Sequence, residues 1–213
     1  MSATSLASPD FIRLARARLR AHPPDLEEAL ANPRGDHSLD AVPVVAPIAP
    51  KPAAVLVPVV LREPEPAVLL TERATGLRQH SGQIAFPGGR VDPEDGSVLA
   101  AALREAREEI GLAERFIRPL GYLDPYLSNS NYLVTPVVAE ITPGYTLELN
   151  PEEVAAAFEV PLRFLMDGAN HQLHSREWKG LERRYYAMPY GERYIWGVTA
   201  GIIRSMYERL YGS

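Results

Sequence analysis

The chain has 213 residues, of which 46% are hydrophobic and 23% are charged, which predicts one full domain with appendages. Its 22 lysines and arginines are outnumbered by 27 aspartates and glutamates, for a net charge of -5, so it lacks the basic excess typical of nucleic-acid-binding proteins. It has no cysteine, which excludes disulfides, thiolate metal sites and a cysteine nucleophile. Since no apolar stretch is long enough for a signal peptide or a membrane span, we expect a cytoplasmic protein with no membrane partner.

The first 52 residues are expected to lie outside the main domain. Apolar residues recur at helical spacing over residues 9–21, and Pro23 and Pro24 end that pattern. Residues 33–52 are rich in proline, alanine, glycine and aspartate, which is typical of an extended surface linker. We therefore expect an N-terminal helix and linker over residues 1–52 and the functional domain over residues 53–213.

Strands alternate with a few helices in the rest of the chain. Short β-branched and aliphatic runs predict strands over residues 53–61, 67–71, 84–86, 120–123, 132–140 and 185–188. Pro58 indicates that the first of these is an edge strand or contains a bulge. Helices are predicted from Ser97 as N-cap through Ile110 with Gly111 as C-cap, from residues 150–153 onwards, and over residues 195–210. This alternation favours an α/β layer architecture.

The helix predicted after Ser97 carries its charges on two separate sides. Glu105, Glu108 and Glu109 lie on one side, and Arg104 lies on the other. Like charges at spacings of three and four destabilise a helix by a few tenths of a kcal/mol per pair. Two explanations are open: a solvated acidic surface, or a bound hard divalent cation, which prefers carboxylate oxygens.

A glycine-rich turn lies shortly before this helix. Gly88 and Gly89 follow Phe86 and Pro87, and two residues without a Cβ let the backbone approach a ligand closely. The turn and the helix together resemble a Nudix box, G-x5-E-x7-R-E-U-x-E-E-x-G-U, in which U is a bulky aliphatic residue. Residues 104–112 match its second half, with Ala106 at the first aliphatic position. In the first half the chain is one residue longer, and Asp95 stands where the early glutamate is expected.

A second, longer signature indicates a branch of this family. Residues 69–89 match every fixed position of L-L-T-x-R-[SA]-x3-R-x3-G-x3-F-P-G-G, the pattern of the coenzyme A pyrophosphatases. That branch also tolerates the lengthened box. The resemblance extends from about residue 53 to the end and implies a Nudix-type α/β/α sandwich with a mixed sheet. It also implies metal-dependent hydrolysis of the pyrophosphate bond of coenzyme A to 3',5'-ADP and 4'-phosphopantetheine, with coenzyme A thioesters as further candidate substrates.

The resemblance also implies roles for particular residues. Ligands of Mg²⁺ or Mn²⁺ are expected at Glu105, Glu108 and Glu109. Catalytic roles are expected for Glu105, Glu108, Glu153 and Arg104, the last by orienting the carboxylates. Substrate contacts are expected from Arg73, Arg78, Gly88 and Gly89, since guanidinium groups bind phosphates in a planar fork.

Several alternatives stay open from the sequence. Arg73 and Arg78 have an ordinary explanation as structural ion pairs. Glu153 has one in a helix-capping box with Asn150 as N-cap. The substrate could be another dinucleotide, such as ADP-ribose or NADH, or the chain could be a nucleotide-binding regulator without turnover, although three intact glutamates argue against the regulator. We expect a small-molecule partner, no nucleic acid, and a possible homodimer.

Overall fold

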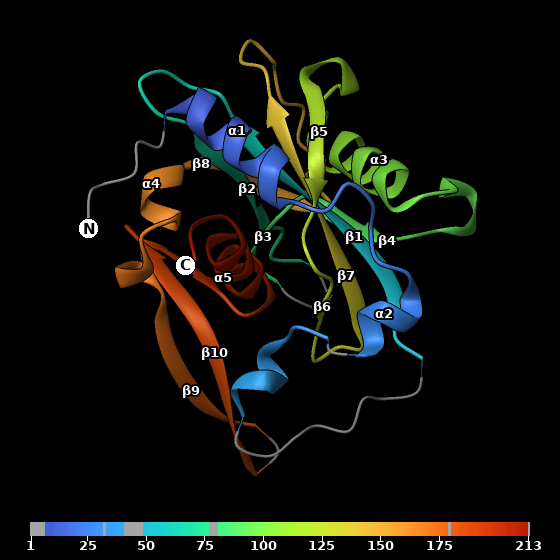
Figure 1. The fold of residues 1–213 in the computed structure, drawn as a ribbon, viewed down its shortest axis with the longest axis vertical. Helices are drawn as coiled ribbons and strands as arrows, with labels where there is room; N and C mark the ends of the chain where they lie inside the picture. Colours follow the sequence, from blue (N-terminus) through green and yellow to red (C-terminus); the bar gives the residue numbers. More distant parts are fainter. Residues whose placement is uncertain (1–6, 32, 41–48, 77–80, 179, 213) are drawn as a thin grey trace.

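The computed structural model describes residues 7–31, 33–40, 49–76, 81–178 and 180–212, and is built around one large sheet with a smaller sheet beside it (Figure 1). The large sheet contains β1 (Lys51–Val60), β2 (Ala67–Arg73), β3 (Ile84–Ala85), β4 (Gly88–Arg90), β5 (Ile117–Tyr122), β6 (Tyr126–Leu127), β7 (Tyr132–Ile141) and β8 (Val154–Pro161). The small sheet contains β9 (Gln172–Trp178), β10 (Leu181–Tyr190) and β11 (Arg193–Trp196).

The helices lie between and around these strands. They are α1 (Ser8–Arg18), α2 (Leu26–Ala31), α3 (Val98–Ile110), α4 (Leu162–Leu165) and α5 (Val198–Tyr211). Single 3-10 turns are η1 (Asp36–Leu39), η2 (Pro93–Asp95), η3 (Glu114–Phe116) and η4 (Gly168–Asn170). Among the described residues, no helix has both the length and the apolar character needed to cross a membrane.

β1 lies in the middle of the large sheet. It runs parallel to β7 and antiparallel to β2 and β4. The pairs that β3 and β8 make with β2, and that β5 and β6 make with β7, are antiparallel. The sheet is therefore mixed, as the resemblance implied.

Helices cover both faces of this sheet (Figure 1). Successive side chains of a strand point to opposite faces. Val57 and Val59 of β1 accordingly pack in one core with Phe11 of α1 and with residues of α5. Leu56 and Val60 pack in the other core with the alanines of α3. The architecture is the predicted α/β/α sandwich.

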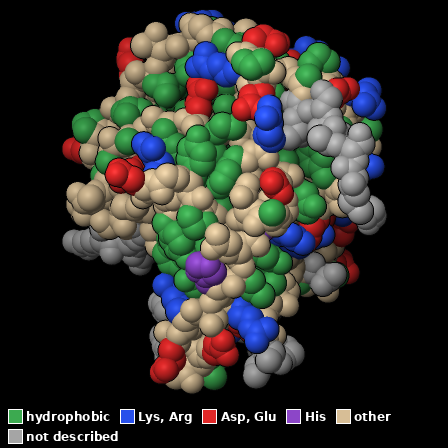
Figure 2. Space-filling view, turned by 90° about the vertical axis from the view of Figure 1, so that its left-hand side faces the viewer, with side chains coloured by type: hydrophobic (Ala, Val, Ile, Leu, Met, Phe, Trp, Pro, Cys, Tyr) green, Lys and Arg blue, Asp and Glu red, His purple; other side chains and the backbone are tan. Residues whose placement is uncertain are grey.

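The small sheet extends from the body as a ribbon. The apolar side chains of Met188 on β10 and Ile195 on β11 are buried in the same core as α5, which fixes one end of the ribbon. The other end projects downward in Figure 1, and Figure 2 shows acidic and basic side chains gathered there. Leu173 and Leu181 are about half exposed on this ribbon, at 52% and 50%.

The N-terminal segment packs on the main body. Phe11 is only 1% exposed, and Arg20 forms a bridge with Tyr122 of β5 through their backbones. Farther along, the Tyr126 hydroxyl donates to the buried carboxylate of Asp36 at 2.6 Å. The predicted helix over residues 9–21 is α1, and the domain boundary at residue 52 stays a prediction.

Three expectations about elements are wrong. The helix predicted from residues 150–153 onwards is absent from the described chain, since residues 151–153 form a turn and strand β8 follows, paired with β2. Pro58 does not mark an edge strand: β1 is central, and Pro58 falls between its pairings with β4 and β2, where a missing N–H removes no antiparallel hydrogen bond. The last helix begins at Val198 instead of residue 195, because Ile195 pairs with Met188 in β11.

Candidate active site

The candidate site is built on α3, whose ends are fixed as the sequence predicts. The Ser97 hydroxyl accepts a hydrogen bond from the Ala100 backbone N–H at 3.1 Å, and Gly111 ends the helix in the left-handed region at φ 66°. Ala102 and Ala106 are fully buried against the sheet. Because the side chains on this buried face are small, α3 lies close to β1 and β4. The helix residues next to the buried face therefore lie near the glycine turn.

Arg104 is the centre of an ion-pair network at the start of the site. Its Nε and second terminal nitrogen donate to the two carboxylate oxygens of Asp95 at 2.7 and 3.0 Å. Its other terminal nitrogen donates to Glu105 at 3.0 Å and to Glu108 at 2.9 Å. It also donates to the Arg90 carbonyl at 3.1 Å. One guanidinium thus connects α3, η2 and β4.

Asp95 has a role that the sequence did not reveal. Asp95 stands where the Nudix box has its early glutamate. Its two carboxylate oxygens accept two hydrogen bonds from the Arg104 guanidinium. The hydrogen bonds from Arg104, followed by one from the Asp92 backbone N–H, hold the pKa of Asp95 below its ordinary value. Asp95 lies nine positions before Arg104 and outside the helix, so neither helical nor strand spacing relates them, and only the folded loop brings them together.

The glycine turn lies directly against two of the predicted carboxylates. The Gly88 backbone N–H donates to Glu109 at 3.2 Å. A Cβ on Gly89 would lie 2.6 Å from an oxygen of Glu105, and one on Gly88, where φ is +155°, would collide with the Ala54 carbonyl. Gly88 therefore requires glycine because a Cβ there would meet backbone, whereas a Cβ on Gly89 would displace the Glu105 carboxylate. This close approach places the backbone of β4 against the acidic side of α3.

Glu105 and Glu109 carry their charges in a confined space. The Glu109 side chain is 3% exposed, and burial raises its pKa to about 7, with Glu105 and Glu153 adding to the rise while the Gly88 N–H and Arg73 oppose it. Burial also raises the pKa of Glu105; Arg104 opposes that rise, and Glu108 and Glu153 add to it. Carboxylates this close together are stabilised by a bound cation, so the donor chemistry fits Mg²⁺ or Mn²⁺.

Arg73 connects the second sequence signature, residues 69–89, to this site. It is the last residue of β2, and its guanidinium lies 3.8 Å from the Glu109 carboxylate. Its Nε is buried and makes no hydrogen bond to any residue that the structure describes. Arg78, the other predicted substrate arginine, lies outside the described residues. The structure therefore places Arg73, Gly88 and Gly89 beside the acidic face of α3.

Glu108 lies differently from its two neighbours. Its side chain is 49% exposed and is paired with Arg104. Within the described part of the chain, no three carboxylate or imidazole side chains converge into a ready-made metal cage. The set of Glu105, Glu108 and Glu109 as metal ligands thus stays a prediction.

Glu153 approaches the same carboxylates from the turn before β8. Its charge raises the pKa of Glu105 and of Glu109, which places it within electrostatic range of both. Its own carboxylate accepts a hydrogen bond from the Asn150 side-chain amide at 3.2 Å. The sequence suggested Asn150 only as a helix cap, and no helix begins there.

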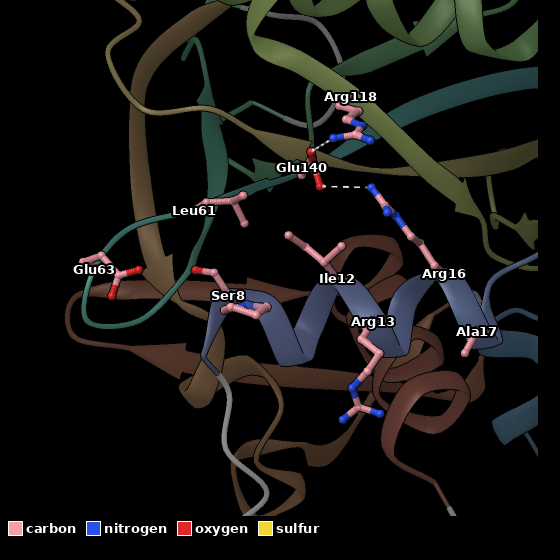
Figure 3. A pocket seen from close by; sticks show the side chains of 10 residues that line it. Ser8, Ile12, Arg13, Arg16, Ala17, Leu61, Glu63, Arg118 and Glu140 are labelled. Atoms are coloured by element: carbon pink, nitrogen blue, oxygen red, sulfur yellow. Dashed lines mark hydrogen bonds and ion pairs between the residues drawn. The ribbon is translucent and has the colours of Figure 1, made fainter.

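A separate groove lies away from these residues, on the face of the sheet that α1 covers. It has a volume of about 890 Å³ and runs between α1 and the ends of β1, β5 and β7. Glu140 accepts from Arg118 at 3.2 Å on its wall and lies 4.0 Å from Arg16 (Figure 3). None of the predicted site residues lines it, so its position gives no support to a role in catalysis.

Comparisons with known proteins identify the family. The NUDIX domain matches residues 50–182, more than half of the chain. A protein of Photorhabdus laumondii called "Uncharacterized Nudix hydrolase NudL" is 43% identical over 158 residues, covering 74% of this chain and 84% of the relative. The protein of the same name from Yersinia pestis is 42% identical over 158 residues, covering 74% and 79%.

Among solved structures, the Nudix hydrolase RenU of M. smegmatis is similar at 25% identity and a TM-score of 0.45, covering 53% of this chain and 71% of that one. The domain match and the two bacterial relatives agree with the helix, the glycine turn and the mixed sheet described above. The chain belongs to the Nudix hydrolase family.

Proposed function

We propose that this Nudix hydrolase cleaves the pyrophosphate bond of coenzyme A to 3',5'-ADP and 4'-phosphopantetheine, with coenzyme A thioesters as further candidate substrates. One observation carries the proposal. Arg73 and Gly88, both fixed positions of the coenzyme A signature, contact the same buried carboxylate, Glu109 of the Nudix helix. These two contacts support a single site for the residues expected to recognise substrate and those expected to hold metal.

The proposed metal ligands are Glu105, Glu108 and Glu109, with Mg²⁺ or Mn²⁺ as the ion. When bound, the ion supplies positive charge to the pyrophosphate oxygens and acidifies the attacking water. Arg104 keeps Glu105 and Glu108 together, because one of its nitrogens donates to both carboxylates. This pairing fixes the two side chains before substrate arrives.

Arg73 and the glycines would act on the substrate. A guanidinium donates to phosphate oxygens in a planar fork, and a terminal nitrogen of Arg73 lies 3.8 Å from the Glu109 carboxylate at the acidic face of the site. Gly88 and Gly89 leave the wall of the site without side chains, so a diphosphate can approach the backbone closely. Arg78 is proposed as a second phosphate contact on the signature alone.

The direct test is to incubate the purified protein with coenzyme A and Mg²⁺ or Mn²⁺, with and without a chelator, and to separate the products by chromatography. We expect metal-dependent 3',5'-ADP and 4'-phosphopantetheine. Cleavage of ADP-ribose or NADH, but not of coenzyme A, would keep the Nudix chemistry and reject the substrate. Binding of all three without turnover of any would favour a regulator.

Glu108→Gln tests the metal helix itself. We expect the variant to keep its fold, because the Glu108 side chain is half exposed and pairs only with Arg104 among the contacts that the structure describes. We also expect turnover to fall about 100-fold, since a carboxylate that would hold the ion loses its charge. Glu114→Gln, on the exposed turn η3, is the matched control. Unchanged turnover in Glu108→Gln would reject Glu108 as a metal ligand.

A further inference from the structure

The groove between α1 and the ends of β1, β5 and β7 contains a buried carboxylate with one unpartnered oxygen. The Glu140 side chain is 9% exposed, and its Oε1 accepts from Arg118 at 3.2 Å. Its Oε2 makes no hydrogen bond to any residue that the structure describes. The Arg16 nitrogen that faces Oε2 lies 4.0 Å away, beyond hydrogen-bond distance. Since a buried acceptor without a partner is unfavourable, a ligand donor would be stabilised at Oε2.

A second polar atom in this groove also lacks a partner. Ser8 is the first residue of α1, yet α1 has no side-chain cap. The Ser8 hydroxyl lines the groove, is buried, and makes no hydrogen bond within the described part of the chain. Buried polar groups in folded proteins are paired in the great majority of cases. Two unpartnered polar atoms in one groove therefore indicate a place where a ligand binds.

The size and the lining of the groove fit a small molecule with an apolar part. Its volume of about 890 Å³ lies within the range of about 300–1,000 Å³ that is typical of small-molecule sites, and it is far larger than one water molecule requires. Ile12, Ala17 and Leu61 give it apolar walls. Figure 3 shows Ile12 directed into the space between α1 and Glu140. The ligand should therefore carry an aliphatic group.

The charges around Glu140 favour a ligand with one negative charge. Glu140 lies between the guanidinium groups of Arg16 and Arg118, whose side chains are 50% and 67% exposed (Figure 3). Arg13 is directed away from Glu140 and pairs with Asp10 at 3.4 Å. Two arginines against one glutamate leave a single positive charge, which fits one carboxylate. Because both arginines would repel a metal ion or an ammonium group at Oε2, the ligand donor there should be a neutral N–H.

We propose that this groove binds a small N-acylated amino acid, which combines one carboxylate, a neutral amide N–H and an aliphatic side chain. The carboxylate pairs with Arg16 and Arg118, the N–H donates to Glu140 Oε2, and the acyl carbonyl accepts from the Ser8 hydroxyl. Along the groove the protein groups follow in the order Arg16, Glu140, Ser8 (Figure 3), which is the order of these three groups in the ligand. Since α1 and α3 cover opposite faces of the sheet, this inference does not rest on the proposed function.

The test titrates the full chain in chelator with N-acetyl-L-leucine and follows the backbone amide signals by NMR. Two matched probes each lack one group: 2-acetoxy-4-methylpentanoate has an ester oxygen in place of the N–H, and N-acetyl-L-leucinamide has no carboxylate. We expect saturable shifts at Ile12 and Ala17 with N-acetyl-L-leucine. Each of the other two probes should bind about 10-fold more weakly, since each loses a hydrogen-bonded contact to a charged side chain.

Variants of the groove assign these losses to particular residues. Glu140→Gln presents an amide NH₂ in place of the Oε2 acceptor, so the preference for the amide over the ester probe should fall from about 10-fold to nearly none. Arg16→Gln should weaken both probes about equally and keep their ratio, because it removes only a carboxylate contact. Arg184→Gln, exposed on β10, removes the same charge elsewhere and should bind like the wild type.

Thermal unfolding without ligand checks that each variant is folded. If Glu140→Gln is not, Ser8→Ala replaces it, because the Ser8 hydroxyl makes no hydrogen bond within the described chain; this variant should bind N-acetyl-L-leucine several-fold more weakly. No saturable shift at Ile12 and Ala17, equal binding of the amide and ester probes, an unchanged preference in Glu140→Gln, or an equal loss in Arg184→Gln would each overturn the proposal. Because the measurement contains neither substrate nor metal, its failure is distinct from a failure to cleave coenzyme A.

Discussion

At the scale of single residues, Arg104 determines how the carboxylates around α3 are arranged. It binds Asp95 through two hydrogen bonds and contacts Glu105, Glu108 and the Arg90 carbonyl. These groups come from three segments, and only a planar guanidinium presents donors in enough directions to reach them together. The spatial arrangement of these carboxylates therefore depends on the shape of the Arg104 side chain as well as on its charge.

Arg104→Lys separates shape from charge. Lysine keeps the positive charge but offers a single nitrogen, so it cannot bind Asp95 in a fork while holding both glutamates. We expect kcat to fall about 10–100-fold and the free energy of unfolding to fall by about 1–2 kcal/mol. Steady-state kinetics and urea denaturation measure the two effects. A kcat equal to that of the wild type would show that charge alone is sufficient.

At the scale of elements, a small polar cluster fixes the loop that leads to the Asn150 turn. Arg62, just after β1, donates to both carboxylate oxygens of Glu159 on β8 at 2.9 and 2.6 Å. The hydroxyl of Tyr145, in the loop after β7, donates to the same carboxylate at 2.8 Å. The segment after β1, strand β8 and the loop after β7 are thus joined at the Glu159 carboxylate.

The substitution Glu159→Gln should reveal the contribution of this cluster through the pH dependence of the free energy of unfolding. Hydrogen bonds from Arg62 hold the pKa of Glu159 below its ordinary value of 4.5, although burial opposes them. A lowered folded pKa contributes stability above the unfolded pKa, and that stability is lost as the pH falls through the folded pKa. Because Arg62 is 45% exposed, solvent screening limits the contribution to about 1 kcal/mol at pH 7.

Chemical denaturation at a series of pH values checks this expectation. The variant should be less stable than the wild type at pH 7, and the difference should shrink as the pH falls below 4.5. Glu114→Gln, on the exposed turn η3, controls for the loss of a surface charge. A difference that stays constant down to pH 3 would show that ionisation of Glu159 is not its source.

At the scale of the whole molecule, the N-terminal segment completes one face of the sandwich. Phe11 and Ala15 of α1 are buried in the same core as Val57 and Val59 of β1. Near the C-terminal end of the described chain, Arg209 of α5 donates to the Arg18 carbonyl at 2.6 Å. Both ends of the described chain therefore pack on the face of the sheet opposite the catalytic helix.

Phe11→Ala tests whether α1 is part of the folded unit in solution. Removing a fully buried phenylalanine side chain should lower the free energy of unfolding by about 3–5 kcal/mol, because a cavity forms between α1 and the sheet. The unfolding midpoint in urea reports the loss, and Leu26→Ala, at a site 60% exposed, is the control. Equal stability of Phe11→Ala and the wild type would show that residues 1–52 are a detachable appendage.

The sequence by itself determined the position and the ends of helix α3, which carries the Nudix motif. The predicted caps at Ser97 and Gly111 are both present in α3. Helical hydrogen bonds connect residues four apart, so the information that specifies a helix, and the side on which Glu105 and Glu109 lie, is contained within a short window. The Nudix family was readable for the same reason, because its motif is a helix and a turn.

The tertiary structure alone decided which distant segments meet this helix. The three alanines of β8 favour a helix locally, and pairing with β2 overrides that preference. The contacts of Asp95 with Arg104 and of the Asn150 backbone N–H with the Glu109 carbonyl join a loop or a turn to groups that sequence spacing does not relate. Such contacts form only when the whole chain has packed, since strand pairing and loop position depend on partners far along the sequence.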